Sequence, residues 1–367
     1  MTQNFLDLEI HTLICNRDLL LAINNFKSLQ KFEEFKNIPV FLHDDGSLSD
    51  FDIKSLSGIN NVTVIRRAEA DKAIYEYLKD YKNCLEYRLG DNKINLWHKI
   101  KSFDYFFFSK TKKVLGIDTD LLFLRKPEDV IKYINSNTPF YFPDIQSAYC
   151  FNEPKGSVPV IDKVNTGLIF IPSEEYYHLT AIENALGNLL KEGINYFPSW
   201  IEQSAFAHMF YIDGRYLSLD IQKYRIPFFQ SIEIEEVECL HFVSYPAVRD
   251  TYKEYVDYLQ FEKEELVYQS SNIVEFREEK VPLTFDIFKG NNTYRLEYYW
   301  GLEKTQQQSL DHIFKIKTLE TESLKAFQSS KNGFFILPFD SGTIGISHTY
   351  DWYGEQNWID LGEVVLK

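Results

Sequence analysis

An apolar run that ends in two carboxylates constrains this chain more than any other stretch. Residues 114–117 are apolar, Asp118-Thr119-Asp120 follows, and residues 121–124 are apolar again. So continuous an apolar run is typical of a parallel strand that is buried on both faces. In open α/β sheets, ligands bind at the edge formed by the carboxyl ends of such strands. The pattern therefore places Asp118 and Asp120 at a ligand-binding edge.

The two carboxylates admit two interpretations. Crowded at an apolar edge, they repel each other unless a cation neutralises them. Oxygen ligands suit Mg²⁺ or Mn²⁺, which often share their coordination with substrate phosphates. A strand that ends in a polar turn, with each Asp capping the next segment, gives the same short motif. The motif alone leaves both interpretations open.

Net charge and the spacing of the cysteines indicate which partners and which cellular compartment to expect. The net charge of −15 argues against partners that are nucleic acids or anionic membranes. Residues 1–9 include acids and lack the apolar segment of a signal peptide, and no apolar run reaches the ~20 residues of a membrane-spanning helix. The cysteines are far apart, with no disulfide or zinc spacing: Cys15, Cys84, Cys150 and Cys239. We therefore expect a cytoplasmic protein with reduced thiols.

The order of apolar patterns predicts the fold class. Strands are expected at residues 8–14, 38–42 and 62–65, with helical spacing between them and over 69–81 and 93–108. This β-α-β-α-β opening predicts a Rossmann-like, mostly parallel α/β sheet with flanking helices. Asp118 then follows about the fourth strand. Later strands are expected at residues 164–171 and 239–242, and later helices at 173–190 and 200–210.

The last part of the chain has a different pattern of apolar and polar residues. From residue 281, alternating apolar stretches are separated by Gly and Asn turns, which predicts a small, sandwich-like β-rich module. We therefore expect two domains, residues 1–280 and 281–367. Aromatic side chains of the module either pack its core or hold a glycan acceptor. They are Tyr294, Tyr298, Tyr299, Trp300, Tyr350, Trp352, Tyr353 and Trp358.

Further motifs accompany Asp118-Thr119-Asp120 in a fixed order. They are Thr12-Leu13-Ile14-Cys15-Asn16, Lys99, Asn165-Thr166-Gly167, Glu202-Gln203 and His241-Phe242. With these motifs, residues 8–262 resemble the GT-A glycosyltransferases, and most closely the glycogenin-like retaining family that includes bacterial lipopolysaccharide glycosyltransferases. The resemblance does not extend to the C-terminal module. It implies the GT-A fold for the first domain.

The resemblance also implies roles for individual residues. Metal ligands would be Asp118, Asp120 and His241. Contacts to the nucleotide-sugar would come from Leu13, Cys15, Asn16, Lys99, Asp118, Thr119, Asn165, Thr166, Gly167 and Arg249. Asp120, Glu202 and Gln203 would be the catalytic residues. Glu202 would deprotonate the acceptor in an inverting enzyme, and the same region would orient the donor sugar in a retaining one.

Each motif taken alone also has a structural interpretation. Lys99 fits a solvated helix face, and Asn165-Thr166-Gly167 fits a turn before a strand. Glu202 fits a first-turn carboxylate that complements the helix dipole. His241 fits a hydrogen-bonded, half-buried histidine. Residues 43–47, His-Asp-Asp-Gly-Ser, fit a turn or a nucleotide contact, and the turn is favoured.

The function implied is a metal-dependent hexosyltransferase of polysaccharide biosynthesis. With Mn²⁺ or Mg²⁺, it would move sugar from a nucleotide-sugar, expected to be a UDP-sugar, to a hydroxyl of a glycan, lipid-linked saccharide or protein. Leu19 or Leu20 stands where the family often has a base-stacking aromatic, which leaves the base open. The alternatives are a non-catalytic carbohydrate-binding or scaffold protein and a nucleotidyltransferase. A haloacid-dehalogenase-type phosphatase fits poorly, because several strands precede Asp118.

Overall fold

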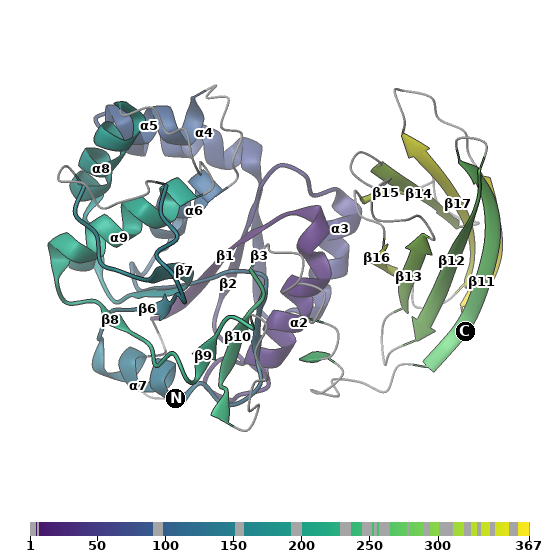
Figure 1. Cartoon of the computed structure of the whole chain (residues 1–367), viewed down its shortest axis with the longest axis horizontal. Helices are drawn as coiled ribbons and strands as arrows, with labels where there is room; N and C mark the ends of the chain where they lie inside the picture. Colours follow the sequence, from purple (N-terminus) through teal and green to yellow (C-terminus); the bar gives the residue numbers. More distant parts are fainter. Residues whose placement is uncertain are drawn as a thin grey trace. The chain divides into compact units, whose positions relative to one another are not determined.

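The chain divides into two compact units. The computed structural model describes residues 5, 7–90, 98–150, 158–191, 200–227, 236–243, 252, 255–256, 265–276, 279–289, 294–300, 311–318, 324–328, 332–337, 342–351 and 359–366. One unit comprises Met1–Leu48 and Ser57–Leu259, and the other Ser49–Leu56 and Gln260–Lys367. Figure 1 shows the elements of each unit.

A seven-stranded sheet with the order β3-β2-β1-β4-β7-β6-β8 forms the centre of the first unit. Its parallel half consists of β1 (Glu9–Ile14), β2 (Val40–Asp44), β3 (Val62–Ile65) and β4 (Val114–Ile117). β1 and β4 are almost wholly buried, as their apolar runs predict. Asp118 follows β4, the fourth strand of the chain, as expected.

The other half of the sheet is mixed. β7 (Val164–Ile171) runs antiparallel to β4 and to β6 (Phe140–Pro143), and β8 (Leu217–Ser218) runs parallel to β6. β7 therefore enters the sheet from the edge at which β4 ends. As a consequence, Asn165-Thr166-Gly167 lies beside Asp118, whose amide donates to the Gly167 carbonyl at 2.7 Å. These three residues belong to strand β7 and do not form the turn expected before it.

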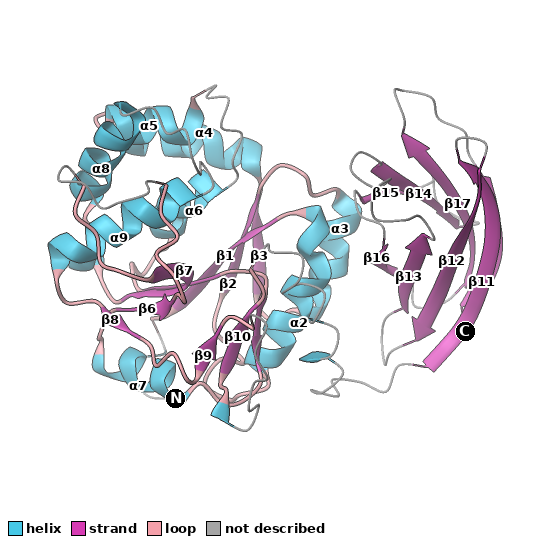
Figure 2. Cartoon of the chain, viewed as in Figure 1, coloured by secondary structure: helices cyan, strands magenta, loops and turns pink. Residues whose placement is uncertain are grey.

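Helices flank this sheet (Figure 2). α6 packs on β1, β2 and β4, while α9 packs on β7 and α6. In the opening part of the chain the helical elements are η1 (Asn16–Asp18), α2 (Leu19–Gln30), α3 (Asp50–Ser55), η2 (Leu56–Gly58), α4 (Arg67–Leu78), α5 (Lys82–Leu89) and α6 (His98–Phe108). Of these, α3 belongs to the second unit. Those that follow are α7 (Glu128–Ser136), η3 (Glu174–Tyr176), α8 (Leu179–Lys191) and α9 (Ile201–Asp213).

A small second sheet includes the strand that follows β4 in the chain. It consists of β5 (Leu121–Phe123), β9 (Tyr224–Arg225) and β10 (Cys239–His241), in the order β5-β10-β9. β10 pairs antiparallel with β5, and His241 stands opposite Leu121. The sequence predicts a strand at 239–242, but it does not identify the partner of that strand.

The second unit contains two antiparallel four-stranded sheets, with the orders β11-β12-β13-β16 and β15-β14-β17-β18. Their strands are β11 (Glu265–Phe276), β12 (Glu279–Lys289), β13 (Tyr294–Trp300), β14 (Asp311–Thr318), β15 (Leu324–Gln328), β16 (Asn332–Leu337), β17 (Gly342–Asp351) and β18 (Ile359–Leu366). The fold class predicted from the sequence is confirmed: a mostly parallel α/β sheet with flanking helices, followed by a β-rich module.

The domain boundary expected at residue 280 needs correction. It falls within the hairpin of β11 and β12, in which Phe276 stands opposite Glu279. Cutting there would separate two paired strands, and the unit instead begins at Gln260. Within the described part of the chain, no helix is long and apolar enough to cross a membrane.

His43 and Asp44 end strand β2, and residues 45–47 form a bend beyond it, in agreement with the turn favoured from the sequence. The Asp44 carboxylate accepts the amides of Gly46 at 2.8 Å and Leu48 at 3.2 Å. The Asp45 carboxylate accepts the Ser47 amide at 2.9 Å. Such side-chain contacts to the backbone two residues ahead are typical of Asx turns.

Candidate active site

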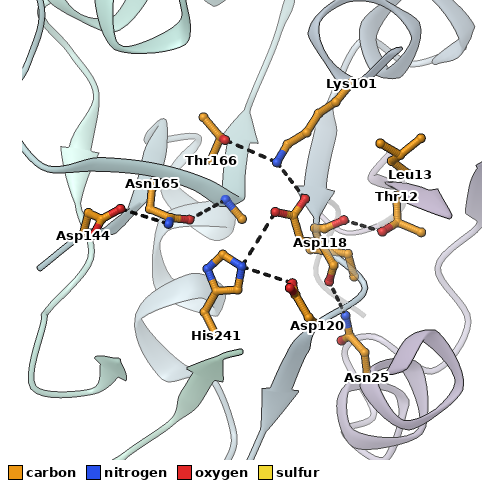
Figure 3. A network of polar contacts seen from close by, with 12 residues as sticks. Thr12, Leu13, Asn25, Lys101, Asp118, Asp120, Asp144, Asn165, Thr166 and His241 are labelled. Carbon is orange, nitrogen blue, oxygen red and sulfur yellow. Dashed lines mark hydrogen bonds and ion pairs between the residues drawn. The ribbon is translucent and has the colours of Figure 1, made fainter. Parts of the chain in front are cut away.

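Two carboxylates and one imidazole converge where three strands begin or end (Figure 3). Asp118 follows β4, Asp120 precedes β5, and His241 ends β10. Each offers a ligand atom within 4.8 Å of the others. The His241 Nε2 lies 3.1 Å from Asp120 Oδ1 and 3.8 Å from Asp118 Oδ2. The three residues named from the sequence as metal ligands therefore come together.

Backbone pairing fixes the position of His241 relative to Asp120. The Phe242 amide donates to the Asp120 carbonyl at 2.8 Å, which continues the pairing of β10 with β5. Gly167 leaves the space that the imidazole occupies, because a Cβ atom on it would lie only 2.3 Å from His241 Cε1. A glycine is therefore required at this position for packing and not for backbone conformation.

The segment that carries Asp118 is held from both sides. The Asn25 side chain on α2 donates to the Asp118 carbonyl at 2.7 Å, and the Thr12 hydroxyl donates to the Ile117 carbonyl (Figure 3). Asn25 and Thr12 are both fully buried. These contacts hold the end of β4 in one geometry before any ligand binds.

Lys101 on α6 is the buried cation beside this cluster. Its Nζ donates to Asp118 Oδ1 at 2.7 Å and to the Thr166 hydroxyl at 3.3 Å, and it lies 3.8 Å from Glu202 Oε1. Burial disfavours the charged ammonium, but Asp118 and Glu202 more than offset this cost and raise the Lys101 pKa above its ordinary value. The sequence analysis named Lys99 and did not name Lys101.

Glu202 at the start of α9 is a buried carboxyl group on the far side of Lys101. Its Oε2 accepts the Thr166 hydroxyl at 3.1 Å. Burial raises the Glu202 pKa to about 7, with the Asp118 charge acting in the same direction and Lys101 opposing it. A carboxyl group near neutrality is suited to holding or accepting a proton in this pH range.

Asn165 and Asp144 form a second buried pair at the site. The Asn165 amide donates to Asp144 Oδ2 at 3.2 Å, and its oxygen accepts the Gly167 amide at 2.8 Å. Burial raises the pKa of Asp144, although Asn165 opposes the shift. Asp144 directly follows β6 and is not named in the sequence-based prediction, because a single Asp after an apolar run carries no distinguishing pattern.

Other residues named from the sequence have contacts of their own. The Leu13 backbone amide donates to the Tyr105 hydroxyl, and the Asn16 backbone amide donates to Ser47 Oγ at 2.9 Å. The Gln203 side chain donates through Nε2 to the Ala148 carbonyl at 2.7 Å. Lys99 and Thr119 are buried. Arg249 lies outside the described residues.

Cys15 has the chemistry of a packed thiol. It is buried, with Sγ 3.3 Å from Asp18 Oδ2. Burial, with a smaller contribution from Asp18, raises the Cys15 pKa to about 12, so the thiol stays protonated. Cys15 would therefore contact a nucleotide through its backbone or by packing, and not through a thiolate.

The three converging residues fit a divalent cation. Two carboxylates and one imidazole supply oxygen and nitrogen donors. The Asp118 side chain is 29 % exposed, so the site is open to solvent there. Carboxylates suit Mg²⁺ and Mn²⁺, whereas imidazole is a ligand of transition metals, so the mixed set fits Mn²⁺ better than Mg²⁺. The negative charge of Asp118 and Asp120 is only partly offset by Lys101.

Glycosyltransferases are among the solved structures that resemble this chain, as the motifs predict. No family model matches the sequence, and no curated protein matches it. Mouse xyloside xylosyltransferase 1 in its apo form is 12 % identical, with a TM-score of 0.44; the match covers 65 % of this chain and 98 % of that one.

Two further structures are similar at the same level. Galactosyltransferase LgtC in complex with donor and acceptor sugar analogs is 13 % identical over 68 % of this chain and 95 % of that one, with a TM-score of 0.41. The Mn/GDP form of core-mannan synthase A from Aspergillus fumigatus is 11 % identical over 58 % and 72 %, with a TM-score of 0.37. These likenesses are remote, so the functional argument rests on the site.

Proposed function

We propose that this chain is a metal-dependent glycosyltransferase that moves a sugar from a nucleotide-sugar to a hydroxyl acceptor. The observation that carries the proposal is the convergence of Asp118, Asp120 and His241 within 4.8 Å at strand ends. The buried ammonium of Lys101, 2.7 Å from Asp118, adds positive charge beside them. Together these groups provide a setting for an anionic diphosphate leaving group.

The ion proposed for this site is Mn²⁺. When bound, it would neutralise the charge that develops on the departing diphosphate. Asp120 and His241 would hold it directly, and Asp118 directly or through water. Because His241 contributes nitrogen, Mg²⁺ would bind more weakly in this set of ligands.

The remaining groups would position the donor. Lys99 and Arg249 are proposed to contact its phosphates, and Leu13, Cys15, Asn16 and Thr119 its nucleotide. Asn165, Thr166 and Gly167 are proposed to contact its sugar. This assignment is supported by the buried Asn165–Asp144 contact of 3.2 Å, which fixes the amide at the edge of the cluster. The UDP-sugar is the proposed donor class.

Glu202 and Gln203 are proposed as the groups nearest the reacting sugar. A Glu202 pKa of about 7 would let its carboxyl take the acceptor proton in an inverting reaction. In a retaining reaction the same carboxyl would orient the donor sugar. Four free, buried cysteines fit the further proposal of a cytoplasmic enzyme of polysaccharide biosynthesis.

The proposal is tested by binding and turnover together. The full chain is titrated with UDP and with GDP, in Mn²⁺ or in EDTA, and binding is followed by thermal stabilisation. Hydrolysis of UDP- and GDP-sugars is measured in parallel. We expect stabilisation and hydrolysis only with metal, and loss of both in Asp120→Ala but not in the exposed control Asp80→Ala. Full hydrolysis in excess EDTA would contradict the proposal.

Two further assays, one with glycans and one with a nucleoside triphosphate and a sugar phosphate, separate the alternatives. A carbohydrate-binding or scaffold protein would bind glycans without consuming any nucleotide-sugar. A nucleotidyltransferase would release pyrophosphate from a nucleoside triphosphate and a sugar phosphate. Either outcome would replace the glycosyltransferase proposal.

A further inference from the structure

The ammonium group of Lys101 lies between two carboxylates. The Lys101 side chain is 2 % exposed, and its Nζ lies 2.7 Å from Asp118 Oδ1 and 3.8 Å from Glu202 Oε1. An ammonium so deeply buried must keep an anionic partner, because water cannot solvate it. The shorter contact makes Asp118 its partner in the metal-free chain.

Asp118 is also one of the three groups that fit a divalent cation. An ion held by Asp118, Asp120 and His241 would bring two further positive charges close to the ammonium. Two cations that share one carboxylate repel each other. Binding of the ion therefore favours a position of the ammonium farther from Asp118.

Glu202 offers that position. Its Oε1 is buried and accepts no hydrogen bond from any residue that the structure describes. A shift of about 1 Å would bring Lys101 Nζ within hydrogen-bond distance of this oxygen, starting from 3.8 Å.

Thr166 connects the two positions. Its hydroxyl accepts from Lys101 Nζ at 3.3 Å and donates to Glu202 Oε2 at 3.1 Å. Because it already bonds to both groups, the hydroxyl can keep both contacts while the ammonium moves. The buried polar network thus has a path for the ammonium with no broken hydrogen bond at Thr166.

We propose that Lys101 exchanges its ion-pair partner when a divalent cation binds, from Asp118 in the metal-free chain to Glu202 in the loaded one. The inference rests on the proposed metal site. Lys101 then competes with the cation for Asp118. Glu202 reduces this competition, because its carboxylate offers the ammonium a second partner. Metal binding would also bring the ammonium to Glu202, the carboxyl group proposed to lie nearest the reacting sugar.

Metal binding measured without nucleotide tests the exchange. Mn²⁺ is titrated into the full chain, and free Mn²⁺ is followed by electron paramagnetic resonance. Lys101→Met should bind Mn²⁺ on the order of tenfold more tightly, because the competing cation is gone. Glu202→Gln should bind it about fivefold more weakly, because the ammonium lacks its second partner. The exposed pair Lys36 and Glu33, 3.2 Å apart, supplies the controls Lys36→Met and Glu33→Gln.

The outcomes distinguish this inference from the proposed function. Unchanged or weaker Mn²⁺ binding by Lys101→Met overturns the exchange and leaves the metal site intact. Failure of the folded wild-type chain to bind Mn²⁺ overturns the metal site and the exchange together. Should Lys101→Met not fold, crystal structures of the wild type in EDTA and in Mn²⁺ decide. The ammonium must be bonded to Glu202 Oε1 only with Mn²⁺, and an unchanged contact with Asp118 overturns the exchange.

Discussion

Gly167 illustrates how one residue can determine a binding site. A Cβ atom at this position would lie 2.3 Å from His241 Cε1, so any side chain must displace the imidazole. We expect Gly167→Ala to lower metal affinity at least tenfold and to destabilise the fold by about 1–3 kcal/mol, a typical cost of overpacking. Mn²⁺ titration and urea unfolding measure the two effects. Gly58→Ala is the control, because nothing lies within 4 Å of its new Cβ.

The buried Glu202 carboxyl group should make the unfolding free energy depend on pH. Burial raises its pKa from 4.5 to about 7, so the folded chain holds this proton more tightly than the unfolded chain between those values. The contribution of Glu202 to stability is therefore full below pH 4.5 and lost as pH rises to about 7. In EDTA, the unfolding free energy of the wild type should fall more across this window than that of Glu202→Gln, by on the order of 3 kcal/mol. If the unfolding free energies of the wild type and Glu202→Gln change equally with pH, this expectation is wrong.

The residues of the site differ in how far the sequence reveals them. Asp118 and Asp120 stand out because two carboxylates interrupt an apolar run. Lys101 does not, because it is one of two lysines on α6, and only the packing of that helix buries it against Asp118. Asp144 likewise depends on the approach of Asn165 from a different strand. Spacing within one segment cannot show contacts between segments.

At the level of elements, a buried ion pair joins three helices. Arg88 on α5 donates two hydrogen bonds of 2.8 Å to Asp104 on α6 and one of 2.6 Å to Asp71 on α4. Both Arg88 and Asp104 are fully buried. Because α6 also carries Lys101, this pair supports the helix that delivers the ammonium to the site.

Breaking this pair tests its role. Arg88→Met should destabilise the chain by about 3–5 kcal/mol, because it leaves the Asp104 carboxylate buried and uncompensated. Unfolding in urea measures the loss. Lys79→Met, which breaks the exposed pair with Glu76, is the control and should leave the unfolding free energy almost unchanged. A small effect for Arg88→Met would show that Asp104 is readily neutralised.

Strands and helices are predictable from local periodicity, but their pairing is not. The apolar patterns place strands at 114–117, 164–171 and 239–242, close to the observed β4, β7 and β10. They do not show that β7 runs antiparallel to β4, or that β10 pairs with the three-residue β5. Those pairings bring Asn165 and His241 to Asp118, and they depend on contacts between distant parts of the chain.

For the whole molecule, the change to alternating apolar residues correctly predicts a second, β-rich unit. It misplaces the start, because the outer strand β11 precedes residue 280 and has exposed apolar side chains at Leu266, Val267 and Ile273. A strand of this kind lacks a clear alternation of apolar and polar residues.

We propose that the second unit holds the acceptor, through aromatics such as Tyr350 and Trp352. Trp352, Tyr353 and Trp358 lie outside the described residues. Tyr294 is only 2 % exposed, so this member of the aromatic set packs the module instead. A chain that ends at Leu259 should keep metal-dependent hydrolysis of donor but lose at least tenfold in transfer to acceptor. Equal transfer by the shortened and full chains, or an insoluble shortened chain, would remove support for acceptor binding.

We propose that Asp118, Asp120 and His241 hold the ion on which the donor diphosphate lies. Anomalous diffraction from crystals of the full chain grown with Mn²⁺ and UDP measures this most directly. We expect a manganese peak within coordination distance of all three side chains, with diphosphate oxygens on its open side. A peak elsewhere, or UDP bound with no metal between these residues and its phosphates, would contradict it.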